Sequence, residues 1–131
     1  MTKAISKKIT ALATRHGWHL TPRVSGDLHL YEVTPETAQQ RDAILRSVRR
    51  CTGLATEVWN PYCSHSFICL IRIYDASELS AWRHRQSQYM ELTDLFDRVM
   101  HNGGTVDQAK AAQLRRAQEI DAMEAYNMIY A

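Results

Sequence analysis

The sequence predicts an α+β fold: an αββαββ unit with a mainly antiparallel four-stranded sheet, followed by a C-terminal antiparallel helix pair. Three observations support this class. Apolar residues recur at helical spacing in two early segments and alternate with polar residues in the segments between them. Turn residues separate the alternating segments into two hairpins. A long helical pattern in the last third is interrupted by two consecutive glycines. Helix–strand–strand repeated twice favours an antiparallel sheet with its helices on one face.

The first helix is predicted over residues 3–16, because apolar residues share one face there while the lysines lie on another. Gly17 is expected to end this helix. A hairpin follows, with strands over 18–24 and 28–33 around a Ser-Gly-Asp turn. Pro22 has no amide hydrogen to donate, so the first strand is expected to lie at a sheet edge or to end in a bulge.

The second helix is predicted over residues 34–51. Thr34 followed by Pro35 is a helix-start pattern, since proline suits the first helical position. A second hairpin follows, with strands over 54–59 and 66–74. The later of these strands is apolar on both faces for most of its length, which is typical of a central strand covered on both sides or of a strand that lies under the C-terminal helices.

Two further helices are predicted over residues 77–101 and 105–128. Each begins with a capping-box pattern, at 75–78 and at 105–108. The Asn-Gly-Gly sequence at 102–104 ends the first of them. Because the connection is short, we expect the two helices to pack as an antiparallel hairpin.

The chain is expected to divide into a sheet unit over 1–75 and a helical hairpin over 76–131 that packs on it within one compact domain. The two αββ passes also resemble each other at a constant offset of 36 residues. The matched positions are Ile9, Leu12 and Gly17 with Leu45, Val48 and Gly53. This match is consistent with an internal duplication, and also with the general similarity of helix–glycine–strand boundaries.

Composition excludes several classes of protein. The 131 residues are 45% apolar and 23% charged, which is close to the average for globular proteins and argues against disorder. The net charge of +2 is too balanced for an electrostatic DNA clamp. No apolar run is long enough to cross a membrane, and no apolar run follows the first lysines as in a secretory signal. The odd number of cysteines then favours a reduced, cytoplasmic protein.

Catalytic and cofactor motifs are missing, so we expect neither an enzyme nor a cofactor. The sequence has no glycine-rich phosphate loop, no Gly-x-Ser-x-Gly and no His-Glu-x-x-His. Cys63 and His65, with Cys51 and Cys69 at a distance, leave a cysteine/histidine-dependent enzyme or a zinc-binding protein as the second alternative. We expect no metal there, because residues 65 to 69 of a strand span about 13 Å.

The sequence favours a non-enzymatic interaction module, a small regulator or inhibitor that binds and occludes a partner protein. Trp, Tyr and Arg are enriched at binding hot spots. The candidate contact residues are Trp59, Tyr62 and His65 in the second hairpin, together with Arg46, Arg49 and Arg50 on the second helix.

Two further partners are considered. Nucleic acid is the first alternative, because the arginines of the second helix and Lys3, Lys7 and Lys8 of the first helix form two basic helix faces. A solvated helix surface explains the same pattern. A homodimer through the C-terminal helices is the other possibility, since Tyr126, Met128, Ile129 and Tyr130 lie close to the end of the described sequence.

Overall fold

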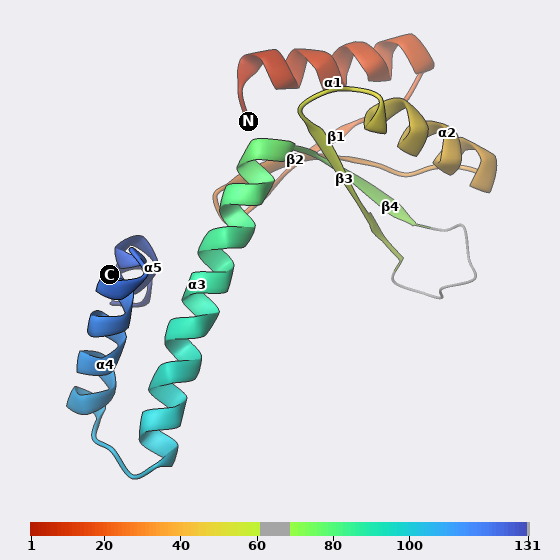
Figure 1. Ribbon diagram of the computed structural model, residues 1–131. Helices are drawn as coiled ribbons and strands as arrows, with labels where there is room; N and C mark the ends of the chain where they lie inside the picture. The colour runs from red at the N-terminus through yellow and green to blue at the C-terminus, as the bar shows by residue number, and fades with distance from the viewer. Residues whose placement is uncertain (61–68, 131) are drawn as a thin grey trace. The chain divides into compact units, whose positions relative to one another are not determined.

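The structure is a computed structural model that describes residues 1–60 and 69–130. It divides into two units, Met1–Ser80 and Ala81–Ala131. The first contains α1 (Lys3–His16), β1 (Thr21–Ser25), β2 (Leu28–Val33), α2 (Ala38–Arg49), β3 (Leu54–Trp59), β4 (Leu70–Asp75) and the first turn of α3 (Ala76–His101) (Figure 1). The second contains the rest of α3, α4 (Val106–Glu119) and α5 (Met123–Tyr130). The predicted α+β class is confirmed.

The four strands form one antiparallel sheet in the order β1-β2-β4-β3. The central pair, β2 and β4, places Leu30 opposite Tyr74 and Glu32 opposite Arg72. β1 lies at one edge, as Pro22 predicted, and β4 is central, as its apolar run predicted.

Helices α1 and α2 cover one face of the sheet. Alternate residues of the central strands, such as Val33 and Ile71, point to that face and pack in one core with helical side chains. Ile9 of α1 and Ile44 and Val48 of α2 are fully buried in this core. Each helix therefore turns one apolar face to the sheet and its opposite face to solvent.

The two αββ segments are joined in the sheet by the pairing of β2 with β4. The helix of each segment is followed by a glycine with a left-handed backbone conformation, Gly17 (φ 74°) after α1 and Gly53 (φ 88°) after α2. The buried helix positions do not follow the offset of 36 residues. Ile9 and Ala13 of α1 correspond to Ile44 and Val48 of α2, an offset of 35. The sequence match aligned half-buried Leu12 with buried Val48. Its offset is therefore one residue larger than the offset that relates the buried positions of the two helices.

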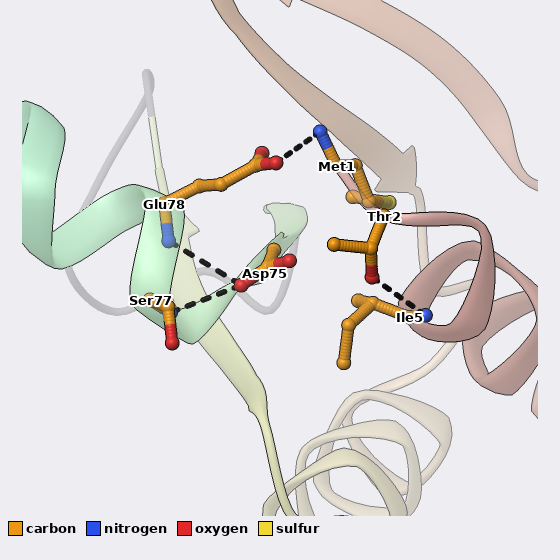
Figure 2. Close-up of polar contacts among 6 residues, drawn as sticks. All are labelled: Met1, Thr2, Ile5, Asp75, Ser77 and Glu78. Atoms are coloured by element: carbon orange, nitrogen blue, oxygen red, sulfur yellow. Dashed lines mark hydrogen bonds and ion pairs between the residues drawn. The ribbon is translucent and has the colours of Figure 1, made fainter.

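The beginnings of α1 and α3 lie side by side (Figure 2). The Thr2 hydroxyl accepts a hydrogen bond from the Ile5 amide at 3.2 Å, and Asp75 Oδ1 accepts from the Ser77 and Glu78 amides at 3.0 and 3.3 Å. The Glu78 carboxylate forms an ion pair with the Met1 amine. The helix start predicted at 75–78 is therefore present, with the Glu78 side chain bound to another segment.

Two predicted helix boundaries were wrong. α2 begins at Ala38, because Thr37 rather than Thr34 caps it: the Thr37 hydroxyl accepts from the Gln40 amide at 3.0 Å. The helix predicted to run to residue 128 ends at Glu119 and restarts as α5, separated by Asp121 with a φ of 54°. The predicted capping box between Thr105 and Gln108 is present.

In the second unit, α4 and α5 pack against α3 through small side chains. Leu92 of α3 is fully buried against Ala117, Ala122 and Ala125. Buried Gln113 donates from Nε2 to the Leu92 carbonyl oxygen at 2.8 Å, which joins α4 to the main chain of α3. Among the terminal apolar residues, Tyr126 and Ile129 pack on this cluster, whereas Met128 is 51% exposed.

Candidate nucleic-acid interface

The two helices that cover the sheet carry a marked excess of positive charge. α1, α2 and the cap residue Arg50 together contain eight Lys and Arg against one acidic residue, Asp42. Seven of these eight cations are exposed, and we call them the basic helix face. Its members are Lys3, Lys7, Lys8 and Arg15 of α1 and Arg46, Arg49 and Arg50 at the end of α2.

The chain itself does not neutralise this surface. The eighth cation, Arg41, forms an ion pair with Asp42, Nε to Oδ1 at 3.1 Å. Within residues 1–60 and 69–130, none of the seven exposed cations forms an ion pair. Their charge is therefore available to an external anion.

Helix stability explains only part of the pattern. Cations in the last turn of a helix interact favourably with its dipole, and Arg15, Arg46 and Arg49 occupy such positions. Lys3 lies at the opposite end, in the first turn of α1, where a cation is unfavourable. Neither α1 nor α2 has an acidic residue in its first turn. Favourable interactions with the helix dipoles therefore do not account for the whole excess of positive charge on the two helices.

A hollow of about 330 Å³ lies where the two basic helices meet the turn into β3. Lys8 and Arg15 of α1 line one side, and Cys51 and Thr52 line the other. Lys8 Nζ donates to the Thr52 carbonyl oxygen at 3.0 Å. The cations that line this hollow, Lys8 and Arg15, both come from α1.

Two acidic residues of the sheet lie on the face opposite the helices. Glu32 and Glu57 are on β2 and β3, and their side chains share a sheet face with Arg72, opposite the face that Ile71 and Ile73 turn to the helices. Glu32 Oε1 accepts from Arg23 Nε at 2.6 Å, and Glu32 Oε2 lies 3.6 Å from Arg72 Nε. On this face of the sheet, the acidic charge of Glu32 and Glu57 is therefore paired with arginines.

The predicted contact residues that the structure describes lie on two different faces. Arg46, Arg49 and Arg50 lie on the basic helix face, whereas Trp59 lies on the opposite face of the sheet, its ring 5.7 Å from Arg72 Cζ. Trp59 is 49% exposed. Tyr62 and His65 lie outside the described residues. Sequence reasoning did not single out Arg15 or Thr52, although the spacing of seven residues from Lys8 to Arg15 places both cations on one side of α1.

The cysteine and metal hypotheses rest largely on residues outside the described ranges, because Cys63 and His65 are among them. Cys51 is half-buried and Cys69 is buried. Burial raises the pKa of the Cys69 thiol and keeps it protonated at neutral pH. In the part of the chain that the structure describes, no three His, Cys, Asp or Glu side chains are grouped closely enough to hold a metal ion.

Comparison with models of known protein families, with curated proteins and with solved structures finds no match to this chain. Over the described residues, no helix combines the length and apolar character needed to cross a lipid bilayer.

Proposed function

We propose that the protein binds nucleic acid through the basic helix face. The observation that carries this proposal is the separation of charge across the first unit. Seven exposed cations on two adjacent helices have no acidic partner there, while the acids of the sheet are paired with arginines on the other side. A surface of this kind matches the regular negative charge of a phosphate backbone.

The chemistry of the face indicates backbone contact rather than base reading. Lysines and arginines on helix surfaces bind phosphate oxygens in any sequence, whereas reading a sequence requires side chains that reach base edges. The hollow lined by Lys8 and Arg15 adds a recess between two cations of this face. We therefore expect binding that depends on salt and little on sequence.

The first test measures fluorescence anisotropy of a short labelled duplex with the purified full chain. R46A/R49A/R50A removes three charges from the basic helix face, and R98A/K110A/R115A removes three exposed charges from the second unit as a matched control. We expect the first variant to bind at least about tenfold more weakly and the control to bind like the wild type. Equal affinities of the two variants would contradict the proposal, provided that circular dichroism shows both folded.

A partner protein at Trp59 is the second candidate, favoured by one observation. Trp59 is half exposed at the end of β3, and Arg72 lies over its ring; these are two residue types enriched at binding hot spots. Affinity capture from the native host, followed by mass spectrometry, tests this candidate. A genuine partner is retained by the wild type and by R46A/R49A/R50A and is lost with Trp59→Ala.

The charge distribution reverses the order of the two hypotheses drawn from the sequence. The sequence predicts the arginines of α2 and Trp59 as contact residues for a partner protein. The structure places them on two faces of the sheet unit, and the basic helix face carries seven exposed cations. Regulation by occluding a partner protein accordingly becomes the second proposal.

A further inference from the structure

We infer that the exposed side of α3 binds the same side of a second copy of this chain, as an antiparallel pair of helices centred on Met90. One side of α3 is already covered, because Leu92 is fully buried against Ala117, Ala122 and Ala125. Another side carries Met90, which is 61% exposed. A shallow hollow of about 910 Å³ runs along it, and among the described residues only those of α3 line that hollow.

The charges on this side are arranged symmetrically about Met90. Arg83 lies seven residues before Met90 and Asp97 lies seven residues after it, which is about two helical turns in each direction. Gln86 and Asp94 lie four residues before and after it. All four of these residues line the same hollow.

This arrangement is complementary to itself. In a two-fold antiparallel pair, each residue before Met90 faces the residue at the same distance after Met90 in the other copy. Arg83 then faces Asp97, and Gln86 faces Asp94, so each contact joins a donor to a carboxylate. A parallel pair would place Arg83 against Arg83 and Asp97 against Asp97, which is repulsive.

The two aspartates of this side have no ion-pair partner among the described residues. Asp94 and Asp97 are exposed, and neither forms an ion pair within residues 1–60 and 69–130. Arg83 of the same helix is out of reach, since fourteen residues separate it from Asp97 by about 21 Å along the axis. A second copy brings the two side chains together, with the Met90 side chains in contact at the centre.

Sedimentation equilibrium of the full chain in reducing buffer, without nucleic acid, tests this inference independently of the proposed function. We expect the wild type to form a concentration-dependent dimer. R83E and D97R alone each place like charges in both contacts of the dimer and should raise its dissociation constant at least about tenfold. Mixed in equal amounts, the two variants restore both Arg–Asp type contacts, and dimerisation should return to the wild-type level.

Met90→Ala and Met128→Ala form a matched pair, because both methionines are more than half exposed in the second unit. We expect Met90→Ala to weaken the dimer and Met128→Ala to leave it unchanged. The inference is overturned if the wild type stays monomeric up to millimolar concentration. It is equally overturned if the charge-reversed variants dimerise as the wild type does, or if their mixture does not recover dimerisation.

Discussion

Lys8 Nζ donates a hydrogen bond to the main-chain carbonyl oxygen of Thr52 at 3.0 Å, and this bond links α1 to the turn that follows α2. The link joins the two helices of the basic helix face at the edge of the hollow lined by Arg15 and Cys51. It holds a cation in place without neutralising it, because a carbonyl oxygen carries no formal charge. Lys8 thus makes a structural contact and, in the proposed function, also contributes a charge for phosphate binding.

Replacing Lys8 should separate these two roles. Lys8→Ala loses one charge and the bond to Thr52, whereas Lys3→Ala loses one charge from the same helix without that bond. We expect Lys8→Ala to lower the free energy of unfolding by about 0.5–1 kcal/mol and Lys3→Ala to change it less. Urea denaturation measures the difference. Equal stability of the two variants would show that the bond to Thr52 contributes nothing.

The buried amide of Gln113 should be a main determinant of stability in the second unit. Its Nε2 donates to the Leu92 carbonyl oxygen, and its Oε1 accepts from the Tyr130 hydroxyl. Gln113→Ala leaves a cavity and removes both hydrogen bonds, so we expect the free energy of unfolding to fall by about 2–3 kcal/mol. The exposed Gln118→Ala is the control and should change it by less than about 0.5 kcal/mol. If thermal or urea unfolding shows an equally small loss of stability in both variants, Gln113 is not a main determinant of stability.

Glu32 should stabilise the sheet through its two arginines. Glu32→Gln removes the negative charge that lies between Arg23 and Arg72, while the side chain keeps its size. We expect a loss of about 1–2 kcal/mol, below the roughly 3–5 kcal/mol of a fully buried pair, because both arginines are partly exposed. Glu36→Gln, at an exposed position in the loop before α2, is the matched control. An unchanged urea midpoint in Glu32→Gln would contradict the role of this charge.

The buried thiol of Cys69 predicts a loss of stability at alkaline pH. Burial raises its pKa above the ordinary value of 9.0, so the folded state holds the proton more tightly than the unfolded state does. The resulting stability is complete below that ordinary value and is lost as pH rises through the folded-state pKa. We expect the free energy of unfolding to fall more steeply above about pH 9 in the wild type than in Cys69→Ala. Parallel curves for the two proteins would exclude a contribution from this thiol.

Much of the architecture could be predicted because it depends on local pattern. The apolar run ending at Tyr74 predicted a central strand, and Pro22 predicted an edge strand. The break at Asp121 could not be predicted, since residues 119–123 contain neither glycine nor proline. That break depends on packing, because Ala122 and Ala125 can reach the core around Leu92 only if the chain turns before α5.

The candidate surface was only partly predictable for a similar reason. The basic residues of α1 and α2 could be counted from the sequence, and their helical spacing placed them on exposed faces. Whether Trp59 shares that surface depends on the face of the sheet on which its side chain lies. A shift of one residue in the register of β3 would move the side chain to the other face. The hollow between Lys8 and Thr52 depends on tertiary contact between residues 44 positions apart.

The salt dependence of duplex binding tests the central claim most directly. Anisotropy titrations from about 50 to 200 mM salt give the slope of log affinity against log salt concentration, which reports how many phosphates are neutralised. If the basic helix face binds the backbone, R46A/R49A/R50A should reduce the magnitude of the slope by about 2.7, and R98A/K110A/R115A should leave it unchanged. Equal slopes for the wild type and both variants would contradict the account.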